Sequence, residues 1–302
     1  DHAEYSQYSA EPLTLNFHRT DHKDGSATYL REYLRKYLMA TRPEKKDYAS
    51  WNYAQFVTDS ILWNTDPLYG WCNKNFKKDG SPYNVYSDGL KVFTTVDSRM
   101  QRYAEETVYQ HVARYLQPAF SKEISSKPSS PYSDKLTPKQ IKAILNRSVT
   151  QCERYRQMKE AGCSAEEIHD TFRKKIPMTV FTYHGDIDTL MSPLDSIRYY
   201  KTYLRSGFMS MDPKTGAVKA YVGGLDYTHF MYDMVSLGRR QVGSTIKPFL
   251  YSLAMENGFS PCDLAPNRQH TYMVAGRPWT PRNANHSRYG QMVTLKWGLQ
   301  QS

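Results

Sequence analysis

The two residues with the clearest chemical potential are Ser244 and Lys247, three positions apart in GRRQVGSTIKPFLYSLAMENG, residues 238–258. Residues at this spacing share one face of a helix, so the lysine amine can reach the serine hydroxyl. A neutral amine could take the hydroxyl proton while the oxygen attacks a carbonyl carbon. Burial and the positive end of a helix dipole both favour the neutral amine. The pair therefore indicates acyl transfer through a serine nucleophile.

Ser244 can equally be an ordinary helix cap. Serine is a preferred N-cap residue, and the helix expected after it has an apolar face that would anchor it in a core. That face consists of Ile246, Phe249, Leu250, Leu253 and Ala254. About one S-x-x-K tetrad is expected by chance in a chain of this size. The tetrad alone does not separate a cap from a nucleophile.

The elements just before the tetrad alternate between strands and helices. Residues 178–183 (MTVFTY) predict a strand, followed by a loop that carries Asp186 and Asp188. Residues 192–207 predict a helix that begins with a Ser-Pro cap, and residues 207–224 predict a β-hairpin. This order favours an α+β fold with an antiparallel sheet.

The first part of the chain is less regular. Residues 26–40 predict a helix with Ser26 as its cap, and residues 89–97 predict a strand. A helix is expected at 98–116, and the Ser/Pro/Lys-rich residues 121–136 are interpreted as a linker.

A charged helix pair is expected between Thr137 and Lys175. Thr137 is a cap followed by proline, and Ser164 with Glu167 forms a capping box. We interpret this segment as a solvated insertion. A non-catalytic docking role for it is the alternative.

The composition indicates a globular chain. The formal charge of +10 favours anionic partners. The basic residues are spread along the sequence without a block of five or six, so nucleic-acid binding is not expected. No run approaches the roughly 20 apolar residues of a membrane span.

Metal and disulfide frameworks are not expected either. The four cysteines have neither C-x-x-C nor zinc-ligand spacing, and the nine histidines are scattered. Whether Cys152 and Cys163 pair is left open. We expect no cofactor.

The residues around the tetrad resemble a known family. MDPKTGAVKAYVGG (211–224), followed by RRQVGSTIKPFLYSLAMENG (239–258), is similar to the transpeptidase module of bifunctional, class A penicillin-binding proteins. Residues 89–108 look like the end of that family's interdomain linker. Residues 10–17 and 25–38 look like the exit from its glycosyltransferase domain. The resemblance implies a β-lactamase/transpeptidase-like antiparallel sheet with flanking helices, incomplete, after an irregular α+β linker.

The resemblance assigns catalytic roles to three residues. Ser244 corresponds to the acylated nucleophile, Lys247 to its general base, and Ser302 to the serine of the family's S-x-N motif. Lys214-Thr215-Gly216 spells the family's K-T-G motif, but it precedes the nucleophile and falls in a hairpin turn, so it receives no role.

Three further residues are tentative substrate contacts. Gly243 and Gln241 adjoin the nucleophile, and Asn283 stands in the polar stretch 277–290, interpreted as a loop bordering the substrate groove. The K-T-G strand is expected to be missing from this polypeptide, and both ends look cut. We therefore expect a fragment that is poorly acylated on its own.

The resemblance also implies a domain plan. Residues 1–90 would be a linker after an absent glycosyltransferase domain, and 91–120 a strand and helix opening the transpeptidase region. Residues 121–176 would be the charged insertion, and 177–302 the first part of the transpeptidase domain.

The implied activity is D,D-transpeptidation of peptidoglycan stem peptides, with β-lactams as inhibitors, at the periplasmic face of the inner membrane. A membrane anchor would lie upstream of Asp1, and other cell-wall synthesis proteins are possible partners. The alternatives are a D,D-carboxypeptidase or β-lactamase-like hydrolase and a non-catalytic docking module.

Overall fold

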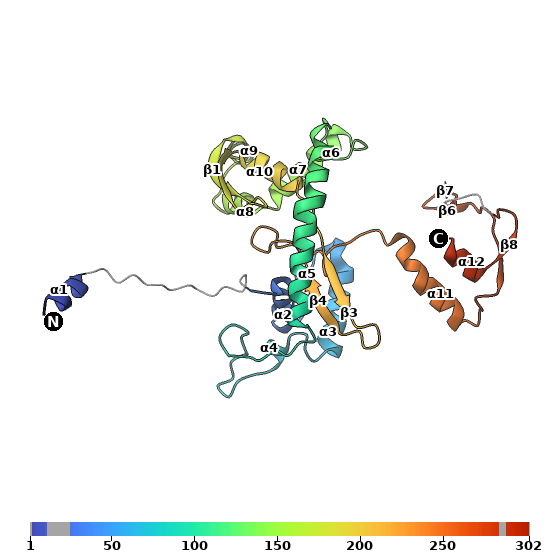
Figure 1. The fold of residues 1–302 in the computed structure, drawn as a ribbon, viewed down its shortest axis with the longest axis horizontal. Helices are drawn as coiled ribbons and strands as arrows, with labels where there is room; N and C mark the ends of the chain where they lie inside the picture. The colour runs from blue at the N-terminus through green and yellow to red at the C-terminus, as the bar shows by residue number, and fades with distance from the viewer. Residues whose placement is uncertain (1, 11–24, 284–287, 302) are drawn as a thin grey trace. The chain divides into compact units, whose positions relative to one another are not determined.

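The computed structural model describes residues 2–10, 25–283 and 288–301 (Figure 1). The chain divides into two compact units, Asp1–Gly238 and Arg239–Ser302. The described residues form helices and four two-stranded sheets, each with an antiparallel pair. This mixture confirms the α+β class. Among the described residues, none of the helices combines the length and apolarity needed to cross a bilayer.

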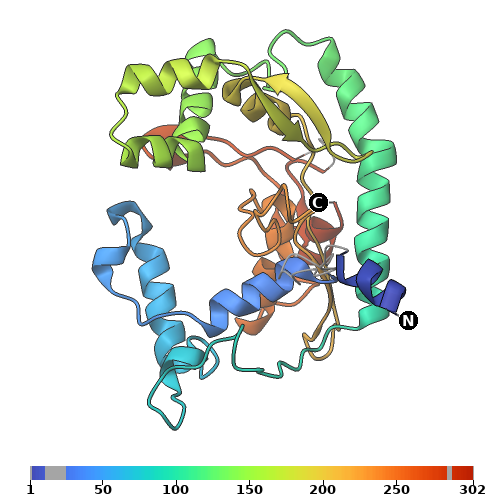
Figure 2. The same cartoon turned by 90° about the vertical axis from the view of Figure 1, so that its left-hand side faces the viewer.

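A long helical segment runs through the first unit. It begins as α5 (Ser98–His111), passes through the π-helical turn η3 (Val112–Leu116) and continues as α6 (Gln117–Ser125). Figure 2 shows it in green as one continuous rod. The Asp97 carboxylate starts the helix by accepting from the backbone N–H groups of Arg99 and Met100. The predicted helix is confirmed and extends into the expected linker.

The predicted hairpin is also confirmed. Strand β3 (Phe208–Met211) pairs with β4 (Val218–Val222), and β4 packs against α5. Asp212 holds the turn because its Oδ1 accepts from the N–H groups of Lys214 and Thr215, both at 2.9 Å. The Lys214-Thr215-Gly216 triplet therefore lies in a turn, as expected.

The strand predicted at residues 89–97 is wrong. Residues 89–97 have no regular secondary structure, although the last of them lie beside β4 and bond to it. Asp97 N–H donates to Lys219 O at 3.0 Å, whereas Thr95 uses its side-chain hydroxyl to reach Val218 O at 2.7 Å. A side chain that takes the position of a backbone donor prevents a regular ladder.

In another part of the first unit, strand β1 (Ile176–Val180) pairs with β2 (Ile187–Met191). Strand β2 corrects the loop expected there: Asp188 lies within it, and its Oδ1 accepts from Thr179 Oγ1 across the pair. The helices nearby are α7 (Pro138–Thr150), α8 (Glu153–Glu160), α9 (Ala165–Arg173) and α10 (Pro193–Lys201).

The caps predicted for this region are confirmed. Thr137 caps α7, Ser164 and Glu167 form a complete capping box at α9, and Ser192 caps α10. The expected helix pair is a set of three, because α8 separates α7 from α9.

Aromatic side chains build much of the core between β1 and α10. The rings of Phe181 and Phe230 meet edge to face at 5.1 Å, and the hydroxyls of Tyr199 and Tyr203 donate to the Phe181 carbonyl. Polar ends of tyrosines thus satisfy backbone groups that the rings bury.

The opening residues of the first unit are helical. Helix α2 (Thr28–Leu38) begins after Ala27, so the cap predicted at Ser26 is wrong; Ser26 Oγ instead donates to Glu105 at 2.9 Å. The other helices of this part are α1 (His2–Ala10), η1 (Lys45–Asp47), η2 (Ser50–Asn52), α3 (Tyr53–Thr65) and α4 (Trp71–Lys74). All four cysteines are free thiols, so Cys152 and Cys163 do not pair.

The second unit is small. It consists of η4 (Gly243–Ile246), α11 (Lys247–Glu256), β5 (Leu264–Pro266), β6 (Tyr272–Val274), β7 (Arg277–Trp279), β8 (Met292–Thr294) and α12 (Leu295–Gln300). Strand β5 pairs with β8, and β6 pairs with β7. Strand β7 corrects the loop expected from residue 277, because Ala275 and Gly276 adopt positive φ and turn the chain back on itself.

Candidate active site

Ser244 lies in the short 3₁₀-helix η4, directly ahead of α11. Its side chain is exposed. Helix α11 starts at Lys247 with Ile246 at the N-cap position, and that cap has no side-chain hydrogen bond. The interpretation of Ser244 as a helix cap is therefore wrong, and the hydroxyl is not used to start the helix.

Gly243 gives the serine its open approach. It has φ +51°, and a Cβ added to it would meet no atom within 4 Å. That conformation is left-handed, which glycine adopts at little cost. A carbonyl group could therefore approach Ser244 from this side.

Lys247 is the first residue of α11 and is half-buried. Pro248 follows it in the first turn, where a missing N–H costs least. Lys247 thus lies at the N-terminus of a ten-residue helix, where the helix dipole is positive. The same positive end would stabilise an oxyanion that develops at Ser244.

The apolar face of α11 is not covered as the sequence predicted. Phe249 is 72% exposed and Leu250 is 58% exposed. The packing of α11 falls on another face: a Cβ added to Gly298 of α12 would lie 2.9 Å from the Tyr251 hydroxyl. Within this unit, the predicted core face faces solvent because α12 approaches the Tyr251 side instead.

The remaining predicted site residues are distributed as follows. Gln241 is exposed in the segment before η4. Asn283 holds a loop, because its Nδ2 donates to Asn267 Oδ1 at 2.8 Å and its N–H donates to the Tyr289 hydroxyl at 2.9 Å. Ser302 lies outside the described residues. Ser244 in η4 and Lys247 at the start of α11 are thus close in the chain, whereas Asn283 is bonded to its own loop.

Two family models match this chain. The penicillin binding protein transpeptidase domain matches residues 206–302, and the penicillin-binding protein middle domain matches residues 127–204. The second match includes most of the segment interpreted as an insertion. This chain belongs to the penicillin-binding proteins.

The relatives have the same family name. Penicillin-binding protein 1A of Neisseria flavescens is 28% identical over 254 residues, which is 74% of this chain and 30% of that protein. Penicillin-binding protein 2D of Bacillus subtilis is 36% identical over 98 residues, or 32% of this chain and 14% of that protein. This chain therefore spans less than a third of the length of these relatives.

A solved structure with partial likeness is penicillin-binding protein 1A from Haemophilus influenzae. The alignment covers 85% of this chain and 38% of that one, at 18% identity and a TM-score of 0.38.

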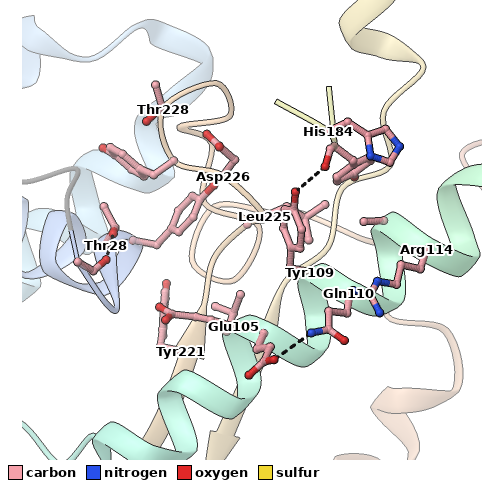
Figure 3. Close-up of a pocket in the computed structure, with 18 residues that line it drawn as sticks. Thr28, Glu105, Tyr109, Gln110, Arg114, His184, Tyr221, Leu225, Asp226 and Thr228 are labelled. Atoms are coloured by element: carbon pink, nitrogen blue, oxygen red, sulfur yellow. Dashed lines mark hydrogen bonds between the residues drawn. The ribbon is translucent and has the colours of Figure 1, made fainter. Parts of the chain in front are cut away.

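A cavity of about 700 Å³ in the first unit was not predicted from the sequence (Figure 3). Gly224 lines it, and the pair Gly223-Gly224 directly follows β4. Two adjacent glycines at the end of a strand are a local signal of a close backbone approach.

Proposed function

We propose that this chain carries the nucleophile of a peptidoglycan D,D-transpeptidase. The observation that supports this most directly is the exposed Ser244 one short turn ahead of the half-buried Lys247, inside the segment that matches the transpeptidase family. A serine that does not cap the helix, followed three residues later by a lysine at the helix start, supports acyl transfer through a serine nucleophile.

In the proposed reaction, the neutral Lys247 amine takes the proton of Ser244 Oγ. The oxygen attacks the carbonyl carbon between the two terminal D-alanines of a stem peptide, and the Ser244 N–H stabilises the resulting oxyanion. Collapse breaks the C–N bond, and the lysine proton passes to the departing D-alanine. The amine of a second stem peptide then attacks the acyl-serine ester, loses its proton to Lys247 and restores the hydroxyl.

β-Lactams follow the first half of this path. The serine oxygen opens the four-membered ring, and the cleaved amine stays attached to the acyl group. No leaving group departs, so the adduct persists. Stem peptides and β-lactams are the proposed ligands, and the proposed location is the periplasmic face of the inner membrane.

We also propose that residues 1–302 alone are acylated slowly. Ser244 is open to solvent and the neighbouring face of α11 is uncovered. A hydrated site weakens every electrostatic interaction with the developing oxyanion.

The test is intact-mass measurement of the full-length gene product after treatment with benzylpenicillin. We expect one adduct, lost in Ser244→Ala and retained in Ser252→Ala, a matched exposed serine on α11. An adduct retained by Ser244→Ala would overturn the assignment. An adduct that hydrolyses within seconds would instead favour the carboxypeptidase or β-lactamase-like alternative.

A further inference from the structure

The cavity in the first unit is built from four separate segments. They are the start of α2, the α5–η3 helix, the residues after β1, and the end of β4 with its following loop. Figure 3 shows Tyr109, Gln110 and Arg114 on the helix and Asp226 and Thr228 on the loop after β4. A cavity of about 700 Å³ is within the usual range for small-ligand sites.

Its walls are fixed by close packing. A Cβ added to Gly224 would lie 2.2 Å from the Tyr29 hydroxyl, so only glycine allows this approach. The same hydroxyl donates to the Phe230 carbonyl at 2.7 Å, and Tyr109 donates to the Tyr183 carbonyl at 3.2 Å. The cavity is therefore pre-formed, which lowers the entropy cost of binding.

The helix departs from regular geometry where it lines the cavity. Ala113 and Arg114 belong to both the cavity wall and the π-helical turn η3. Single π-turns inside α-helices are rare and occur frequently at functional sites. This observation is independent of the cavity itself, and both point to the same residues.

The lining favours a neutral, polyhydroxylated ring. Three half-buried tyrosines from three of these segments, Tyr109, Tyr183 and Tyr227, line the cavity, and aromatic rings pack on the C–H face of a sugar. The buried Tyr29 and Tyr221 support the wall behind them. Carboxylates accept hydrogen bonds from sugar hydroxyls, and a guanidinium donates hydrogen bonds to an acetamido carbonyl.

The charged groups of the lining restrict the chemical class of the ligand further. Glu106 is exposed, and its Oε1 accepts a hydrogen bond from Gln110 Nε2 at 2.9 Å. A carboxylate can accept further hydrogen bonds from other partners. Asp226 Oδ1 accepts from the His229 backbone at 2.9 Å. Three carboxylates in the wall, those of Glu105, Glu106 and Asp226, disfavour phosphate groups, and the exposed Arg114 disfavours a simple cation.

We infer that this cavity binds saccharide units of the peptidoglycan glycan strand, whose sugars are N-acetylated and carry the stem peptides. The inference rests on the proposed function for its substrate. Binding the strand in the first unit would retain the polymer on the protein between successive cross-linking events.

The experiment is calorimetric titration of residues 1–302 with chitotetraose, a soluble tetramer of N-acetylglucosamine. Glu106→Gln and Arg114→Ala each should lower the association constant about tenfold or more, the size expected for one charged hydrogen bond. The matched controls are Glu123→Gln and Arg102→Ala, exposed residues of the same helical segment outside the cavity wall, and they should leave it within about twofold.

No binding at millimolar chitotetraose, or binding unchanged in both cavity variants, overturns the inference. All four replaced side chains are exposed, so circular dichroism should show folded proteins. Benzylpenicillin acylation of the full-length gene product is measured separately. Saccharide binding without acylation would remove the proposed function and keep the site; acylation without saccharide binding would do the reverse.

Discussion

The Gln101 side chain pairs with both backbone polar groups of Tyr221. Its Nε2 donates to Tyr221 O at 2.8 Å, and its Oε1 accepts from Tyr221 N at 2.7 Å. Gln101 is 1% exposed and belongs to α5, whereas Tyr221 belongs to β4. The Gln101 side-chain amide thus makes the two hydrogen bonds that a neighbouring strand would make. These bonds hold α5 against β4, and both elements line the cavity.

Gln101→Leu should destabilise the protein by about 2–4 kcal/mol, because the buried N–H and C=O of Tyr221 would both lose their partners. Urea denaturation followed by circular dichroism measures this change. Gln110→Leu is the control on the same helix, since Gln110 Nε2 donates to the exposed Glu106 side chain. Its effect should be below about 1 kcal/mol. Equal losses in both variants would contradict the bridging role of Gln101.

Lys247→Arg separates a base from a mere positive charge. Arginine keeps the charge at the start of α11 but does not lose its proton in proteins. If Lys247 is the base, benzylpenicillin acylation of the full-length gene product should slow by about 10²–10⁴-fold. Lys296→Arg, on α12 of the same unit, should leave the rate unchanged. A Lys247→Arg variant that keeps its rate would show that charge suffices.

Features set by a few neighbouring residues could be predicted from the sequence. The Thr137 and Ser164 caps depend on side chains three positions from their partners, and the hairpin turn depends on Asp212. The Ser244–Lys247 spacing is local as well, but the catalytic role of the pair stays a prediction. A distant partner can still replace such a local contact: Ser26, predicted as a cap, donates to Glu105 instead.

Features set by distant contacts could not be predicted. Residues 89–97 alternate like a strand, yet Thr95 meets β4 through its side chain. Strand β2 is defined by its pairing with β1. The exposure of Phe249 depends on which face of α11 meets α12, and the cavity needs four segments at once. Periodicity contains no information about these partners.

Removing the hydroxyl of Tyr183 and removing that of Tyr221 should have different effects on the free energy of unfolding. Tyr183 Oη is buried, and the described residues offer it no hydrogen-bond partner; burial raises its pKa to about 12, so it stays neutral. Tyr183→Phe should therefore leave the free energy of unfolding unchanged or raise it by up to about 1 kcal/mol. Tyr221→Phe should lower it by about 1.5–3 kcal/mol, because Tyr221 donates to the buried Asp233 carboxylate at 2.6 Å. Urea denaturation of both variants measures the difference, and a larger loss in Tyr183→Phe would contradict the assigned bonding.

The loss of stability at acid pH should depend on Glu32. This carboxylate is 8% exposed and accepts from Arg35 Nε at 2.7 Å and Nη2 at 2.5 Å, and the hydrogen bonds from Arg35 hold the pKa of Glu32 below its ordinary value. A pKa lowered on folding stabilises the protein above the unfolded value of about 4.3, and that contribution is lost as the pH falls through the lower folded value. Wild type should therefore exceed Glu32→Gln in unfolding free energy at pH 6, and the gap should close toward pH 3. Glu44→Gln, at an exposed pair with Lys46, should change the profile little. A gap that stays constant from pH 6 to pH 3 would show that the Glu32 charge does not contribute to folding.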